Sequence, residues 1–132
     1  MLQEISLSTS KKQEFVDITL DINNIVKKSK IKEGICVVYC PHTTTGITIN
    51  ENADPSVKKD MIKKLSQLVP ENDGYSHTEG NSDAHINSSI LGNEKSIIIK
   101  NNELILGTWQ GILFFEGDGP RKRRVLVKII KS

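Results

Sequence analysis

The three histidines of the chain, His42, His77 and His85, are the residues whose type best suits a metal site. Three imidazole nitrogens with an open fourth position are a usual ligand set for catalytic zinc. Their spacing matches no local zinc motif, so only the tertiary fold can bring them together. The alternative is two surface histidines and one that is partly buried. A divalent metal, zinc or magnesium, is therefore a predicted cofactor that depends on this convergence.

Cys40 lies two residues before His42, in a segment that is typical of a β-strand. Alternate residues of a strand face the same side, so the pair could act as a nucleophile and its base, or as two metal ligands. The preceding run, Ile35–Tyr39, is mostly apolar. Such surroundings raise the pKa of a thiol, so we favour a buried, unreactive cysteine.

Thr43, Thr44 and Thr45 follow, directly ahead of Gly46. Hydroxyl and backbone N–H groups at a flexible turn can hold phosphate oxygens. Threonine is also common in ordinary turns and strands, so both interpretations stay open. Glu51 comes shortly afterwards and is a candidate general acid or base, with a solvated carboxylate as the alternative.

The segment from Glu116 to Arg124 combines acids, glycines and bases around one turn. Carboxylates such as Glu116 and Asp118 can hold Mg²⁺, and arginine binds phosphate oxygens through two parallel hydrogen bonds. Alternation along a strand would send Arg121 and Arg123 to one side, and the two other basic residues to the opposite side. The pattern predicts a site for a phosphorylated small molecule, with a solvated basic face as the alternative.

Hydrophobic periodicity predicts the elements that must position these residues. Strands are expected near 2–7, 15–19, 35–40, 46–49, 96–100, 104–109, 112–116 and 125–131. Helices are expected from Asp21 to near Gly34, from Asp54-Pro55 to just before Pro70, and from Ser82 or Asp83 to Gly92. Strand 35–40 is expected to be buried on both faces, and Trp109 in the core. The polar segment 70–82 is expected to be a functional or disordered loop. The result is an α+β fold with mostly antiparallel strands.

Composition argues against several classes of partner. Lys and Arg number 18 and Asp and Glu 16, and the net charge of +2 predicts no general attraction to DNA or to an acidic membrane. Aromatic residues make up 5% of the chain, which disfavours a stacking platform for single-stranded nucleic acid. The longest apolar stretches are far too short to span a bilayer. We therefore expect neither a nucleic acid nor a membrane as partner.

Cys36 and Cys40, the two cysteines, lie in the same predicted strand. At about 3.3 Å per residue their Cα atoms are roughly 13 Å apart, whereas a disulfide needs about 7 Å or less. Unpaired thiols suit a reducing compartment. The N-terminal segment has no signal-peptide pattern. We therefore predict one cytoplasmic domain over residues 1–132.

Taken together, the polar segments resemble the YjbQ-like family, over nearly the whole chain from about Phe15 to Ile130. The matching stretches are, in order, His42-Thr43-Thr44 with Gly46, Asn50-Glu51-Asn52 with Asp54-Pro55, His77, Gly80-Asn81, Ala84-His85, Leu91-Gly92, Gly107-Thr108-Trp109-Gln110, and Glu116 with Asp118-Gly119-Pro120-Arg121. Each stretch is common by itself, but their order and spacing together are specific.

The resemblance implies two packed, mostly antiparallel sheets with helices outside, a homotrimer, and a polar pocket near the histidines. It also implies secondary thiamine-phosphate synthase activity, in which a thiazole phosphate attacks a pyrimidine pyrophosphate and pyrophosphate leaves. A metal-dependent hydrolase of phosphorylated metabolites and a non-catalytic metabolite-binding trimer are the alternatives. The resulting candidates are His42, His77 and His85 for metal, Glu51, Glu116 and Asp118 for catalysis, and Thr43, Thr44, Thr45, Asn81, Arg121 and Arg123 for substrate binding.

Overall fold

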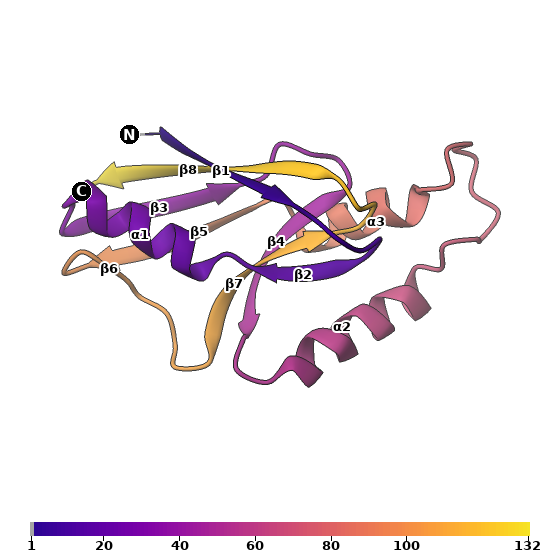
Figure 1. The fold of residues 1–132 in the computed structure, drawn as a ribbon, viewed down its shortest axis with the longest axis horizontal. Helices are drawn as coiled ribbons and strands as arrows, with labels where there is room; N and C mark the ends of the chain where they lie inside the picture. Colours follow the sequence, from indigo (N-terminus) through magenta and orange to yellow (C-terminus); the bar gives the residue numbers. More distant parts are fainter. Residues whose placement is uncertain (1) are drawn as a thin grey trace.

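Two antiparallel sheets and three helices make up residues 2–132, the part of the chain that the computed structural model describes (Figure 1). The strands are β1 (Leu2–Ser8), β2 (Glu14–Asp17), β3 (Glu33–Tyr39), β4 (Thr45–Glu51), β5 (Glu94–Lys100), β6 (Glu103–Leu104), β7 (Gln110–Glu116) and β8 (Lys122–Lys131). The helices are α1 (Thr19–Ser29), α2 (Pro55–Leu68) and α3 (Ser82–Leu91). This is the α+β fold predicted from the sequence.

The strand order decides which chain segments meet at the sheet ends. The larger sheet has the order β1-β8-β3-β5-β6 and the smaller one β2-β7-β4, with antiparallel pairing throughout. β7 and β8 are consecutive in the chain but belong to different sheets. The short segment between them therefore crosses from one sheet to the other, and it carries the acid–glycine–arginine turn.

The main core lies between the two sheets because alternate residues of each strand face inward. The larger sheet contributes Cys36, Val38, Ile97, Ile99, Val125, Val127 and Ile129, and the smaller sheet Ile47, Ile112 and Phe114. α1 adds Ile22 and Val26. Full burial of one such side chain stabilises the fold by about 1.5–3 kcal/mol. Because this core joins the two sheets, it fixes the positions of their ends relative to each other.

Three expectations from the sequence were wrong. β3 is buried on one face only, because no helix within residues 2–132 covers the outer face of the larger sheet, and Ile35 is exposed there. The strand expected over 104–109 ends at Leu104, where the chain leaves β5 to reach the smaller sheet. Trp109, expected in the core, is 64% exposed in the loop that follows.

The helix boundaries follow local chemistry for α2 and packing for the others. Asp54 Oδ1 accepts a hydrogen bond from Ser56 N at 2.9 Å, with Pro55 in the first turn, as predicted. α1 begins at Thr19, so the cap expected at Asp21 was wrong. α3 follows Asn81, and Ser82 and Asp83 are buried in its first turn rather than capping it.

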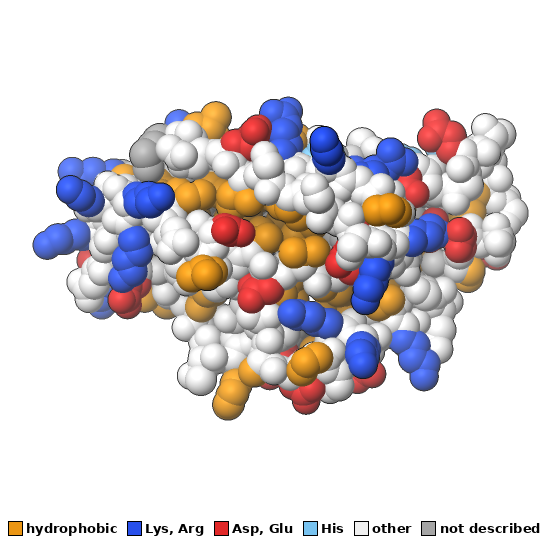
Figure 2. All heavy atoms as spheres, viewed as in Figure 1, with side chains coloured by type: hydrophobic (Ala, Val, Ile, Leu, Met, Phe, Trp, Pro, Cys, Tyr) orange, Lys and Arg blue, Asp and Glu red, His pale blue; other side chains and the backbone are white. Residues whose placement is uncertain are grey.

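Both cysteines are free and buried, as expected. Burial raises the pKa of Cys36 to about 11 and also raises the pKa of Cys40. Cys40 Sγ accepts a hydrogen bond from Thr45 Oγ1 at 3.2 Å. In residues 2–132, no helix is both long and apolar enough to cross a membrane. On the face seen in Figure 2, acidic and basic side chains are interspersed.

Candidate functional site

Most of the predicted site residues line one polar pocket of about 360 Å³. The pocket lies where the β3–β4 turn, the start of α3 with the loop before it, and the β7–β8 crossing meet. Its lining residues are Thr43, Thr44, His77, Glu79, Asn81, His85, Asp118, Arg121 and Arg123. Segments that are far apart in the sequence thus form one site.

Strand register explains this convergence. The first residue of β4, Thr45, pairs with the last residue of β7, Glu116. Gly117 N then donates to Thr44 O at 3.0 Å, which places the threonine turn against the β7–β8 crossing. A Cβ atom at Gly117 would lie 2.8 Å from Thr44 O, so only glycine allows this approach.

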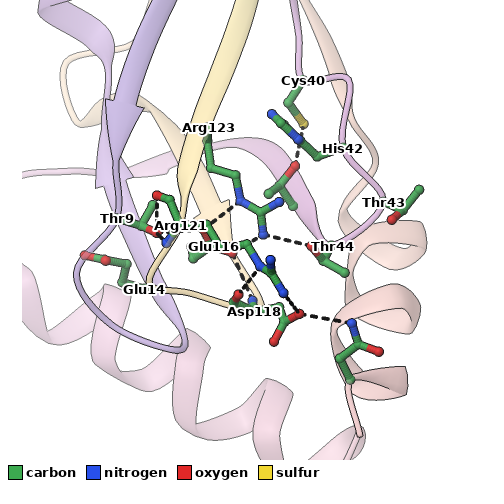
Figure 3. A network of polar contacts seen from close by, with 12 residues as sticks. Thr9, Glu14, Cys40, His42, Thr43, Thr44, Glu116, Asp118, Arg121 and Arg123 are labelled. Atoms are coloured by element: carbon green, nitrogen blue, oxygen red, sulfur yellow. Dashed lines mark hydrogen bonds and ion pairs between the residues drawn. The ribbon is translucent and has the colours of Figure 1, made fainter. Parts of the chain in front are cut away.

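A buried ion pair between Glu116 and Arg123 supports the pocket from behind (Figure 3). Glu116 is 0% exposed and Arg123 8% exposed. Arg123 Nε donates to Glu116 Oε1 at 2.8 Å, and its Nη2 donates both to Oε2 and to Thr44 Oγ1. Thr9 Oγ1 and Asp118 N also donate to Glu116, at 2.7 and 2.9 Å. Both carboxylate oxygens are therefore occupied.

These hydrogen bonds determine the protonation state of Glu116. Burial raises the pKa of its carboxyl, but the hydrogen bonds from Arg123, Asp118 N and Thr9 outweigh burial, and the net pKa is lowered. Glu116 is thus an ionised, saturated acceptor that holds Arg123. Positioning Arg123 fits this geometry better than the Mg²⁺-binding or catalytic role expected from the sequence.

Arg121 is held in a similar way, nearer to solvent. Its Nε donates to Asp118 O at 2.8 Å and its Nη2 to Asp118 Oδ2 at 2.9 Å. Asn81 Nδ2 donates to the same Oδ2 at 3.0 Å. Burial raises the pKa of Asp118, but the hydrogen bonds from Asn81 and Arg121 outweigh it, so that pKa is lowered. Two oriented guanidinium groups therefore line one pocket, as strand alternation predicted.

His77 and His85 lie side by side at the pocket, with ring centroids 5.4 Å apart and ring planes at 80°. His85 Nδ1 lies 3.2 Å from Thr43 O. Because a carbonyl oxygen can only accept, Nδ1 carries the proton and Nε2 is left free to bind a ligand or a proton. His77 Nε2 is 3.9 Å from Glu79 Oε1, at the rim of the pocket.

His42 has a different role from the other two histidines. β3 has already ended at Tyr39, and His42 Nε2 accepts from Arg124 N at 3.1 Å in place of a strand neighbour. Burial and the nearby Arg123 lower the pKa of His42, which favours the neutral ring that this hydrogen bond needs. His42 therefore stabilises the start of β8 through this hydrogen bond and does not line the pocket.

The expected metal site does not fit one chain as the sequence suggested. Within the described residues, no three His, Cys, Asp or Glu side chains lie close enough together to hold an ion. His77 and His85 are neighbours, but the Nε2 of His42 is already used. A metal bound by all three histidines of one chain would require that hydrogen bond to break.

Two other candidates lie outside the pocket. Thr45 is buried and bonded to Cys40. Glu51 is at the opposite end of β4, paired with Gln110, and at about 3.3 Å per residue it is roughly 20 Å from Thr45. Sequence reasoning missed Thr9, whose hydroxyl supports Glu116 and also accepts from Arg121 N at 2.9 Å. Nothing in the sequence around Thr9 marks it for this role.

One buried atom of the pocket points to a ligand. Asn81 Oδ1 is buried and has no hydrogen-bond partner within residues 2–132. An orphaned buried acceptor is destabilising by about 1–3 kcal/mol unless water or a ligand donates to it. Since Asn81 lines the pocket, a ligand with an N–H or O–H group could donate to this oxygen.

The fold and the pocket define a small α+β protein of two packed antiparallel sheets, with a polar site at the crossing between them. A family model described as "UPF0047 protein YjbQ-like" matches residues 3–132, and the chain belongs to this family. It is 58% identical over 130 residues to the UPF0047 protein MJ1081 of Methanocaldococcus jannaschii, covering 98% of this chain and 94% of that protein. It is 47% identical over 131 residues to YugU of Bacillus subtilis, covering 98% and 99%.

Solved structures agree with this membership. An uncharacterised conserved protein of the YjbQ/UPF0047 family from Clostridium acetobutylicum superposes with a TM-score of 0.96 at 53% identity, covering 97% of this chain and 99% of that one. A YbjQ-like protein of unknown function from Sulfolobus solfataricus gives a TM-score of 0.97 at 33% identity, covering 100% and 97%. The resemblance noted from the sequence is thereby confirmed.

Proposed function

We propose that the pocket binds a phosphorylated small molecule through Arg121 and Arg123, and that the chain is a transferase acting on a pyrophosphate ester. Thiamine-phosphate synthesis is the reaction of this kind that we favour. The observation that carries the proposal is the pair of guanidinium groups in one pocket, each held by its own carboxylate. Because both side chains are oriented before a ligand arrives, little rotamer entropy is lost on binding.

Recognition in this pocket depends on directed donors. Glu116 and Asp118 offset much of the charge of the two arginines, so the pocket has no large excess of positive charge. Thr44 Oγ1 already accepts from Arg123, which leaves its hydroxyl hydrogen free to donate to a phosphate oxygen. We therefore expect pyrophosphate, which can span both guanidinium groups, to bind better than inorganic phosphate.

The chemistry follows from the same donors. In thiamine-phosphate synthesis the thiazole nitrogen forms a bond to the pyrimidine's methylene carbon. The bond from that carbon to oxygen breaks, and its electron pair leaves with pyrophosphate. Arg121 and Arg123 would stabilise the charge that develops on the leaving oxygen. Because Nδ1–H is held by Thr43 O, His85 Nε2 can take up a proton from solvent and pass it to the leaving pyrophosphate.

Binding is tested by thermal shift with pyrophosphate and with phosphate. We expect pyrophosphate to raise the melting temperature of the wild type and Arg121→Gln to lose most of that increase. Arg124→Gln is the matched control, because Arg124 lies three residues further along, in β8, but pairs with Glu4 outside the pocket. An equal loss in both variants would mean general surface charge rather than this pocket.

Turnover is tested by supplying the pyrimidine pyrophosphate and the thiazole phosphate with Mg²⁺ and detecting thiamine phosphate by mass spectrometry. Product above the level of a His85→Asn variant would support the synthase. Binding without product would favour the metabolite-binding alternative, which gains support from the fact that Glu116 and Asp118 are both engaged in hydrogen bonds. Release of phosphate from phosphorylated metabolites would favour the hydrolase instead.

A further inference from the structure

A second cavity, of about 410 Å³, lies between α2, the segment that joins β1 to β2, and the first turn of α3 (Figure 1). It shares no lining residue with the pocket of Arg121 and Arg123. Its volume is within the range of small-molecule sites in proteins. Asp83, a residue of the first turn of α3, lines it. We call this space the Asp83 cavity.

The Asp83 cavity has an apolar side and a polar side. Ile62, Ser66 and Val69 recur at a spacing of four and three residues, so they share the side of α2 that faces the cavity. Gln13 and Lys12 come from the segment before β2 and line the opposite side. Ser66 Oγ donates to Gln13 Oε1 at 2.9 Å, which joins the two sides. A ligand here would therefore meet both apolar surface and hydrogen-bonding groups.

Asp83 differs from Glu116, the other buried carboxylate of residues 2–132. Asp83 is 1% exposed and Glu116 0% exposed. Glu116 accepts from four donors. Within the same residues, Asp83 accepts one long hydrogen bond, from Gln13 Nε2 to Oδ2 at 3.5 Å, and its Oδ1 has no partner. A buried carboxylate that lacks donors is destabilising. Asp83 is thus a strong acceptor, largely unused, at the wall of a cavity.

Lys12 does not supply the missing hydrogen bonds. Its Nζ is 3.7 Å from Asp83 Oδ2, too far for a hydrogen bond, but 2.6 Å from Glu71 Oε1. The ammonium group therefore offsets the charge of Asp83 without satisfying it. The two acids that line the cavity are balanced by two lysines, Lys11 and Lys12. This balance favours a neutral hydrogen-bond donor over a cation as the ligand group that binds Asp83.

We propose that the Asp83 cavity binds a small neutral molecule that carries a primary carboxamide on an apolar ring. The amide N–H would donate to Asp83, and the carbonyl oxygen would accept from Lys12, whose ammonium has three donors. The ring would pack on Ile62 and Val69. The inference goes beyond the proposed function and does not depend on it, because the two sites share no lining residue.

The test is a titration of the ¹⁵N-labelled full chain with benzamide, followed by NMR. We expect saturable shifts concentrated at residues 11–13, 62–71 and 83. Binding should be about tenfold weaker in Asp83→Asn, since a hydrogen bond to a charged acceptor is lost. Asp60→Asn is the matched control, because Asp60 is an exposed acid of α2 outside the cavity, and it should bind benzamide as the wild type does.

A second probe tests the donor without changing the protein. N,N-dimethylbenzamide keeps the ring and the carbonyl group but has no N–H, so it should also bind the wild type about tenfold more weakly than benzamide. The proposal is overturned if the two amides bind equally, if Asp83→Asn binds benzamide as well as the wild type, or if benzamide gives no saturable shift. The probe comparison decides even if Asp83→Asn does not fold.

Thermal unfolding distinguishes a binding carboxylate from a structural one. Asp83→Asn removes a buried charge that has few donors, so it should keep or raise the melting temperature, whereas Glu116→Gln should lower it. A fall as large as that of Glu116→Gln would make Asp83 a structural partner of Lys12 and count against the proposal. In the wild type, pyrophosphate binding without benzamide binding would refute this inference alone, and the reverse would refute the proposed function alone.

Discussion

Replacing Glu116 by Gln would remove one charge from a buried ion pair while keeping the shape of the side chain. The carboxylate accepts from four donors: Arg123 Nε, Arg123 Nη2, Thr9 Oγ1 and Asp118 N. An amide keeps one acceptor oxygen and turns an NH₂ group toward the donors at the other position. Arg123, 8% exposed, would then be a buried charge with no counterion. Breaking a buried pair in this way is destabilising by roughly 3–5 kcal/mol.

That loss is large for a domain of this size. Native domains have an unfolding free energy of about 5–15 kcal/mol, and a loss of 3–5 kcal/mol corresponds to a fall in melting temperature of roughly 10–20 °C. Urea unfolding followed by circular dichroism measures the loss directly. Glu103→Gln is the control, because Glu103 forms only an exposed pair with Lys27 and should lose less than about 1 kcal/mol.

A double variant distinguishes an unpaired charge from general disruption. Glu116→Gln combined with Arg123→Met removes both charges, so it should be more stable than Glu116→Gln alone. Our reasoning is refuted if Glu116→Gln loses less than about 1 kcal/mol, or if the double variant is no more stable than the single one. Glu116→Gln protein that remains folded should also bind pyrophosphate weakly, because Arg123 would lose its orientation.

Four further predictions follow from the same structure. Arg121→Gln should remove most of the melting-temperature increase produced by pyrophosphate, whereas Arg124→Gln should keep it. The folded pKa of His42 is lowered from 6.5, so its contribution to stability is full above pH 6.5 and falls as the pH drops from there to the folded pKa; urea midpoints at pH 7.5 and 5.5 should show this fall in the wild type and less of it in His42→Gln. Gly119→Ala should be destabilised by several kcal/mol in urea, because the new methyl group would meet Lys11 O. Elemental analysis of tag-free protein should find less than one metal per chain; one full equivalent that is lost in His85→Ala would contradict the single-chain geometry.

The sequence predicted the architecture where local chemistry decides it. The start of α2 follows from Asp54 and Pro55, which act within one helical turn. The antiparallel strands follow from alternation and turn residues, and the inert thiols from the apolar run around them. The site-bearing segments could be recognised because the order and spacing of their polar residues are specific, although each stretch has a structural alternative by itself.

Burial was predicted less well because it depends on which other segment covers a face. The apolar run in β3 predicts a strand buried on both faces, yet its outer face is uncovered within residues 2–132. Trp109 is apolar enough for a core and is nevertheless exposed. The sequence shows which residues are large and apolar, but whether each of them is exposed depends on how the chain packs.

The sequence by itself determined the α+β class, the family and the set of polar residues from which a site is built. Only the tertiary structure decided which of these residues line the pocket, which support it and which lie elsewhere. Contacts such as Thr9 to Glu116 join residues 107 positions apart, and their existence depends on strand register and on the packing of two sheets. For this reason Glu116 holds Arg123, His42 fastens β8, and Glu51 lies at the far end of its strand. The type of a residue and its neighbours in the sequence limit the interactions it can form, and long-range packing determines which partners it contacts.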